Sequence, residues 1–118
     1  MTTLQIAMIT ALAVEGAHPS TVADGGKAVG IAQIWPVTIQ ECNRILGSEV
    51  YTLADRTDPD KSLEIMRVVL TYQQTRQPAC DAVWLACRWR NPYSVSPSWH
   101  KSKIEAAVRG VMAAERGG

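Results

Sequence analysis

The sequence has almost no excess of charge of either sign: 12 lysine and arginine residues stand against 11 aspartate and glutamate residues in 118. A net charge of +1 argues against nucleic-acid binding driven by bulk charge. We interpret a short basic cluster late in the chain as a solvated surface; it comprises Arg88, Arg90, His100, Lys101 and Lys103. No apolar run reaches the 18 residues of a membrane span, so no membrane insertion is expected.

Cysteine is also scarce, and its three residues, Cys42, Cys80 and Cys87, cannot make a disulfide framework because their number is odd. Cys80 and Cys87 fall on one predicted helix, where two turns separate them by roughly 10 Å, beyond the reach of a bridge. We therefore expect reduced, structural thiols and synthesis in a reducing compartment. Metal-ligand spacings such as C-x-x-C or H-x-x-x-H do not occur in the sequence, so neither a metal nor a cofactor is expected.

Hydrophobic residues make up 47% of the chain, which predicts one globular domain over residues 1–118. Apolar periodicity and helix-end signals predict a mostly α fold, of the α+β type, with about five helices and a small β-ribbon. The helices are expected near residues 2–15, 36–46, 59–75, 78–90 and 96–116, the ribbon near residues 20–34, and a loop over residues 48–57. On the second helix, the apolar stripe Trp35, Ile39, Cys42 and Leu46 is expected to face the core.

The first apolar segment, LQIAMITALA, permits two interpretations. It resembles the core of a signal peptide, since it ends in Ala-x-Ala. However, no lysine or arginine precedes it, and Thr2 and Gln5 have the spacing of a capping box, which indicates a helix of the mature protein. We favour the helix, and expect Gly16 and Pro19 to end it.

Glu15 is the first candidate catalytic residue. It is predicted to lie at the C-terminal end of a largely buried helix, where the helix dipole and the apolar neighbours Leu12 and Val14 disfavour its ionised form. A general acid that works near neutral pH needs these surroundings. The alternative is an ordinary exposed glutamate at a helix end.

Asp24 is the second candidate, nine residues further on. The Asp24-Gly25-Gly26 sequence predicts a hairpin turn, a solvated place where an acid stays ionised. Two carboxyl groups in contrasting surroundings are typical of glycoside hydrolases. The glycines, Gly30 included, would let a sugar chain approach the backbone. A plain turn is the alternative.

The segment GKAVGIAQIWPVT resembles a motif of lytic transglycosylases and goose-type lysozymes, within the lysozyme-like superfamily. In that motif a G-x-x-G-[LI]-x-Q-[IV] string follows the catalytic glutamate, and its positions fall on Gly30, Gln33, Ile34, Pro36 and Thr38. The pair Glu15-Gly16 with Asp24 is similar to phage lysozymes, although Gly30 stands where those enzymes have threonine. LACRWRNP, residues 85–92, is similar to a late segment that closes the cleft, with Trp89-Arg90 in place of Tyr-Asn.

The resemblance implies a peptidoglycan-cleaving enzyme that acts on the β-1,4 bond between N-acetylmuramic acid and N-acetylglucosamine. Glu15 would be the acid, and Asp24 would hold a water or stabilise the transition state. The substrate contacts would be Gln33, Gly30, His18, Trp89 and Asn91, while Trp35 would pack in the core. His18 and Trp89 also suit a solvated loop and a core position. The resemblance further implies a monomeric, phage-type protein, made in the cytoplasm, that acts on the bacterial cell wall.

Other functions stay open at this point. Lytic transglycosylation would use Glu15 alone, because the sugar's own 6-hydroxyl replaces water. A chitinase or chitosanase would use the same acids on another glycan. A wall-binding or virion module could keep the fold without activity.

Overall fold

The computed structural model describes residues 1–90 and 101–117 of the chain, and this part is mostly helical, as expected. A two-stranded ribbon interrupts the helices near the N-terminus, and a short 3-10 helix, η1, lies within the expected loop of residues 48–57. In chain order the elements are α1 (Thr3–Glu15), β1 (Val22–Ala23), β2 (Ala28–Val29), α2 (Pro36–Leu46), η1 (Leu53–Thr57), α3 (Pro59–Arg76), α4 (Ala82–Arg90) and α5 (Lys101–Gly117). The predicted mostly α fold with a small ribbon is confirmed.

Both ends of α1 are fixed by the residues that the sequence indicated. The Thr2 hydroxyl accepts a hydrogen bond from the Gln5 backbone N–H at 3.1 Å, and the Gln5 side chain accepts one from Thr2 at 2.8 Å. Gly16 adopts the left-handed conformation, with φ of 56°, and its N–H donates to Leu12. Because glycine adopts this conformation without a steric penalty, the helix ends at Glu15.

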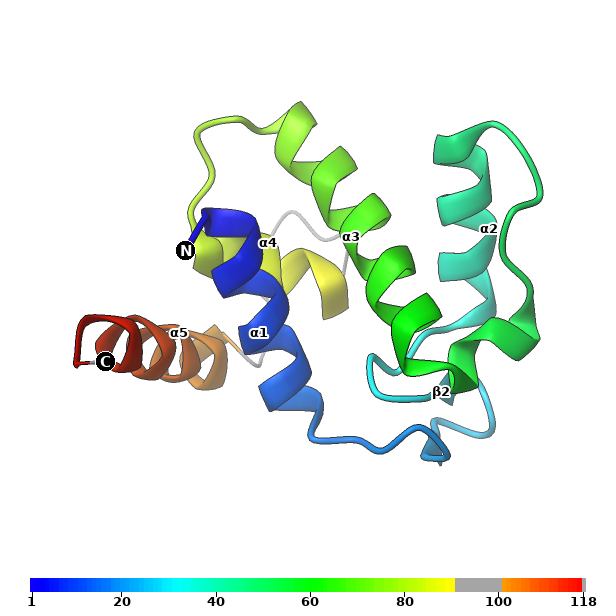
Figure 1. The fold of residues 1–118 in the computed structure, drawn as a ribbon, viewed down its shortest axis with the longest axis horizontal. Helices are drawn as coiled ribbons and strands as arrows, with labels where there is room; N and C mark the ends of the chain where they lie inside the picture. Colours follow the sequence, from blue (N-terminus) through cyan, green and yellow to red (C-terminus); the bar gives the residue numbers. More distant parts are fainter. Residues whose placement is uncertain (91–100, 118) are drawn as a thin grey trace.

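The central helix α3 also begins where its sequence predicts. The Asp58 carboxylate accepts hydrogen bonds from the backbone N–H groups of Asp60 and Lys61, and Pro59 occupies the first helical position. Figure 1 shows α3 in the middle of the molecule, with α2 on one side and α1, α4 and α5 on the other. Its buried apolar side chains, Ile65, Met66, Val69 and Leu70, belong to the hydrophobic core, and the polar Ser62 is buried as well.

The fourth helix begins four residues later than expected, at Ala82 instead of Pro78. The Asp81 carboxylate accepts a hydrogen bond from the Trp84 backbone N–H at 2.8 Å, so Asp81 caps the helix and Cys80 precedes it. The placement of Cys80 and Cys87 on one helix was therefore wrong. Cys42 and Cys80 carry free thiols, as expected. The expected start of the last helix, near Ser96, lies outside the described residues.

The buried stripe of α2 also differs from the prediction. Ile39 and Cys42 are buried, but Trp35 and Leu46 are exposed, with 37% and 42% of their surfaces accessible. Trp35 occupies the N-cap position and has an extended backbone, so its side chain does not continue the helical stripe. Asn43 is buried instead, because its side-chain oxygen accepts hydrogen bonds from the backbone N–H groups of residues 50 and 51.

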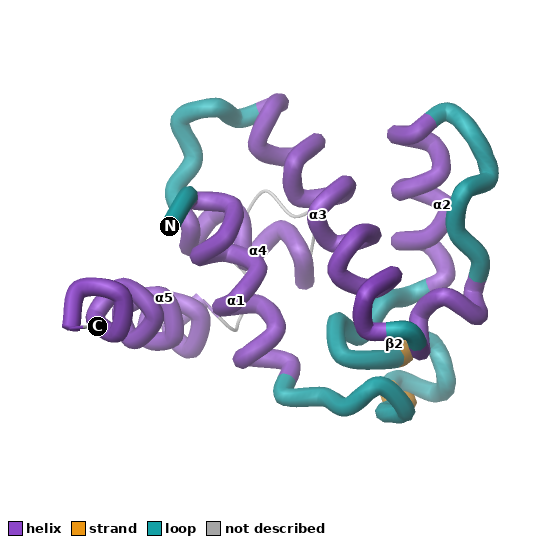
Figure 2. Tube along the Cα trace, in the orientation of Figure 1, coloured by secondary structure: helices purple, strands orange, loops and turns teal. Residues whose placement is uncertain are grey.

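The ribbon is small and sits in the connection between α1 and α2, where Figure 2 shows two short strands between long loops. Its antiparallel register pairs Val22 with Val29 and Ala23 with Ala28. The intervening turn has left-handed φ values at Asp24, Gly25 and Gly26, of 55°, 69° and 91°. The predicted glycine turn is therefore confirmed. No described helix is long and apolar enough to cross a membrane.

Candidate active site

Glu15 is the last residue of α1 and is partly buried. Its neighbours Leu12 and Val14 pack against the hydrophobic core. Glu15 thus stands at the C-terminal, negative end of the α1 dipole, as the sequence predicted. Directly after it the chain leaves the helix and runs toward the ribbon (Figure 1).

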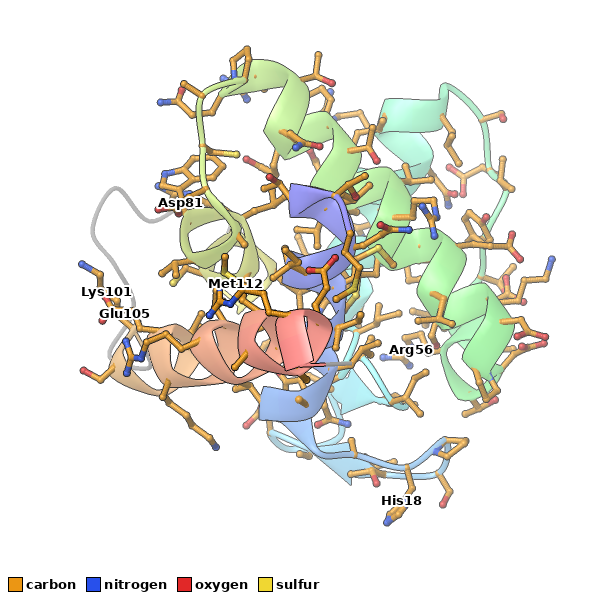
Figure 3. The ribbon with its side chains drawn as sticks, turned by 60° about the vertical axis from the view of Figure 1, so that its left-hand side comes forward. His18, Arg56, Asp81, Lys101, Glu105 and Met112 are labelled. Carbon is orange, nitrogen blue, oxygen red and sulfur yellow. The ribbon has the colours of Figure 1, made fainter. Side chains whose placement is uncertain are left out.

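The segment between Glu15 and the ribbon is shaped by Thr21. The Thr21 hydroxyl accepts a hydrogen bond from the His18 backbone N–H at 2.9 Å, and the Thr21 N–H donates to the His18 carbonyl at 3.0 Å. His18 is exposed, and Figure 3 shows its side chain pointing away from the body of the molecule. The backbone of His18 orders this loop, while its imidazole belongs to the solvated surface.

Asp24 lies on the exposed turn of the ribbon. Its backbone carbonyl accepts a hydrogen bond from the Lys27 N–H at 3.4 Å, which closes the turn. Across residues 1–90 and 101–117, the Asp24 carboxylate forms no ion pair. Asp24 is therefore an exposed acidic side chain, in contrast with the partly buried Glu15.

Gln33 secures the loop that follows the ribbon. It has a left-handed φ of 51°, and its side-chain Nε2 donates to the carbonyls of Gly30 at 2.9 Å and Thr21 at 3.3 Å. Since an amide nitrogen has two hydrogens, both side-chain donors of Gln33 are already used. Only its Oε1 remains for a ligand, and it can accept a hydrogen bond from a sugar hydroxyl or an acetamido N–H.

Gly30 is buried and serves the packing of this loop. A Cβ atom at this position would stand 1.9 Å from the Arg56 carbonyl oxygen, and φ is 86°. The Gly30 N–H donates to Thr21, and its carbonyl accepts from the Gln33 backbone. The missing side chain thus admits the backbone of η1, and both polar backbone groups of Gly30 have partners inside the protein.

Arg56 hydrogen-bonds to the backbone on both sides of β2, a role that the sequence did not suggest. Its Nη1 donates to the carbonyls of Lys27 at 2.9 Å and Ile34 at 3.1 Å, and its Nε donates to Leu53 at 3.0 Å (labelled in Figure 3). The Lys27 and Ile34 carbonyls lie on segments that are distant in sequence from η1. A lone arginine in a loop carries no local pattern, so only the folded contacts identify it.

Trp89 joins α4 to the same loop. Its indole Nε1 donates a hydrogen bond to the Ala32 carbonyl at 2.9 Å, and its ring packs against the core. This favours the core interpretation of Trp89 that the sequence had left open. Asn91, the remaining predicted substrate contact, lies outside the described residues.

The candidate residues are therefore a partly buried glutamate at the end of α1, an exposed aspartate on the ribbon turn and an amide acceptor, Gln33, on the loop after the ribbon. In the part of the chain that the structure describes, no three His, Cys, Asp or Glu side chains come together as a metal site requires. Comparisons with protein-family models, with curated proteins and with solved structures give no match for this chain.

Proposed function

We propose that this protein is a peptidoglycan-cleaving glycosidase, with Glu15 as the general acid that protonates the glycosidic oxygen. The bond attacked would be the β-1,4 linkage between N-acetylmuramic acid and N-acetylglucosamine, as the resemblance of residues 26–38 implies. The protein would act as a monomer on the bacterial cell wall. A phage-type origin, with synthesis in the cytoplasm, belongs to the same proposal.

One observation carries the proposal: a partly buried glutamate ends a core helix, and an exposed aspartate occupies the ribbon turn that follows. Glu15 ends α1 at the negative pole of its dipole, where a carboxyl group suits the part of an acid that donates a proton to a leaving oxygen. Asp24 is exposed on the turn, where a water molecule can reach its carboxyl group. Glycoside hydrolysis needs this division between one acid and one base or stabiliser.

Asp24 is assigned to the water that attacks the anomeric carbon, which makes the reaction a hydrolysis. A transglycosylase needs no such residue, because the sugar's 6-hydroxyl attacks instead. Gln33 supports the reacting sugar as a hydrogen-bond acceptor through Oε1, since its Nε2 is committed to Gly30 and Thr21. Its rigid placement suits a contact that must orient a substrate.

The test measures dye release from labelled, insoluble peptidoglycan by wild type, Glu15→Gln and Glu105→Gln. Glu105 is the matched control, because it lies on α5 in a surface ion pair with Lys101 at 3.5 Å. We expect Glu15→Gln to fold normally and to lose about 10²–10⁴-fold in rate, the usual contribution of acid catalysis. Glu105→Gln should match wild type.

Three results would contradict the proposal. A wild-type rate of dye release by Glu15→Gln would show that Glu15 is not the general acid. Binding to peptidoglycan without any cleavage by wild type would indicate a wall-binding module. Cleavage of chitin or chitosan in preference to peptidoglycan would assign another glycan to the same acids.

A further inference from the structure

An exposed tryptophan and a lysine stand together at the edge of the ribbon. The Lys27 ammonium lies 5.4 Å from the centre of the Trp35 ring, and Trp35 is 37% exposed. Within the described ranges, no carboxylate pairs with Lys27. The pair therefore presents a flat aromatic surface and a positive charge that has no acidic partner in this part of the protein.

The backbones of both residues are held in place by a single side chain. Arg56 Nη1 donates to the carbonyl of Lys27 and to that of Ile34, the residue before Trp35. Val29 and Ile34 exchange two backbone hydrogen bonds, at 3.0 and 3.2 Å, which keep the two segments side by side. Pro36 then fixes the backbone on the far side of Trp35. An exposed aromatic residue with a backbone so constrained loses little freedom when a ligand binds.

We propose that Lys27 and Trp35 form a binding subsite for a sugar ring that carries a carboxylate. In the unbound protein the Lys27 ammonium lies over the Trp35 ring, and it would swing aside to pair with the carboxylate substituent while the apolar C–H face of the sugar stacks on the indole. A neutral sugar could use only the first contact. A carboxylate without a sugar ring could use only the second.

This inference rests on the proposed function, and it names the part of the glycan that the site would recognise. The turn that begins with Asp24 ends at Lys27, and Gln33 precedes Trp35 by two residues on the same pinned loop. Lys27 and Trp35 therefore neighbour both candidate residues along the chain. In peptidoglycan, N-acetylmuramic acid carries a lactyl carboxyl group, whereas chitin has no carboxylate. The subsite would therefore favour peptidoglycan.

The experiment titrates the inactive Glu15→Gln protein with two tetrasaccharides and follows the indole N–H signals by NMR. One probe alternates N-acetylglucosamine with peptide-free N-acetylmuramic acid, and the other contains N-acetylglucosamine alone. The Trp35 signal is assigned with Trp35→Phe. We expect this signal to shift with both probes, and the dissociation constant to be lower for the acidic one.

Substitutions separate the two contacts. Lys27→Met should raise the dissociation constant of the acidic probe about two- to fivefold, as an exposed ion pair allows, and leave that of the neutral probe unchanged. Trp35→Ala should raise the dissociation constants of both probes by about fivefold to tenfold. Lys61→Met, at an exposed lysine in the first turn of α3, should change neither.

The inference is overturned if the Trp35 signal stays unmoved by both probes, or if Lys27→Met weakens them equally. It is also overturned if active wild type and Trp35→Ala cleave peptidoglycan with the same KM, and the proposed function would survive that result. If the acidic probe binds at Trp35 but wild type releases no dye, the subsite stands and the enzyme proposal fails.

Discussion

The indole Nε1 of Trp89 donates a 2.9 Å hydrogen bond to the backbone carbonyl of Ala32, a residue 57 positions earlier in the chain. This bond joins the last turn of α4 to the loop that carries Gln33. Arg56 reaches the same loop from η1, through the carbonyl of Ile34. Two distant parts of the chain thus determine where the candidate substrate contact lies.

Replacing Trp89 by phenylalanine should keep most of the packing but leave the Ala32 carbonyl without this donor. We expect a loss of about 0.5–1.5 kcal/mol in the free energy of unfolding, the usual worth of one hydrogen bond. Amide hydrogen exchange should also speed up in residues 30–34. Trp84→Phe is the matched control, because no hydrogen bond of the Trp84 indole occurs among the described residues. Equal exchange in both variants would contradict the role given to Trp89.

Two glycines of the ribbon should respond differently to alanine, although both have left-handed φ values. Gly26→Ala meets no atom within 4 Å, so it should cost only about 1–2 kcal/mol of backbone strain. Gly30→Ala must in addition displace the Arg56 carbonyl, and we expect about 2–5 kcal/mol. Urea denaturation of both variants measures the difference. Similar losses in the two variants would show that η1 does not pack on Gly30.

Stability should fall in alkaline solution because two buried groups resist ionisation. Burial raises the pKa of the Cys42 thiol from 9.0 to about 11. Burial, and then the hydrogen bond to Glu64, raises the pKa of Tyr51 from 10.0 to about 12. The folded state therefore binds more protons than the unfolded state above pH 9, and its stability declines from there through pH 11 and 12.

Thermal unfolding measured from pH 7 upward checks this expectation. Cys42→Ala and Tyr51→Phe lower the starting stability through lost packing, so the informative quantity is the slope of Tm against pH. Each substitution should make the alkaline slope shallower. A slope that neither substitution changes would assign the alkaline loss to other groups.

Local signals in the sequence predict much of the fold. Thr2 with Gln5, Gly16, and Asp58 with Pro59 fix helix ends through neighbours within a few residues, so these boundaries can be found without a structure. The predicted start of α4 at Pro78 is wrong, because Asp81 caps a helix that begins at Ala82. A proline and an N-capping aspartate three residues apart both signal a helix start, and the folded chain shows which of them is used.

The candidate site is less predictable, because its supports come from far along the chain. Gly30 is predicted to contact the substrate, but the space beside its Cα is occupied by the backbone of Arg56. Trp35 was assigned to the core and is exposed, since the chain is still extended where it precedes α2. Glu15 and Asp24 were proposed from position and turn chemistry, and their roles remain predictions.

The most direct test of the central claim is mass spectrometry of the fragments that the protein releases from purified, insoluble peptidoglycan. Hydrolysis with Glu15 as acid and Asp24 holding water predicts soluble muropeptides that end in reducing N-acetylmuramic acid. Glu15→Gln should release none above the blank, and Asp24→Asn should release far less than wild type. Anhydromuramic ends would indicate transglycosylation, in which Asp24 holds no attacking water. Release by Glu15→Gln at the wild-type rate, or no glycan fragments from wild type, would contradict the account.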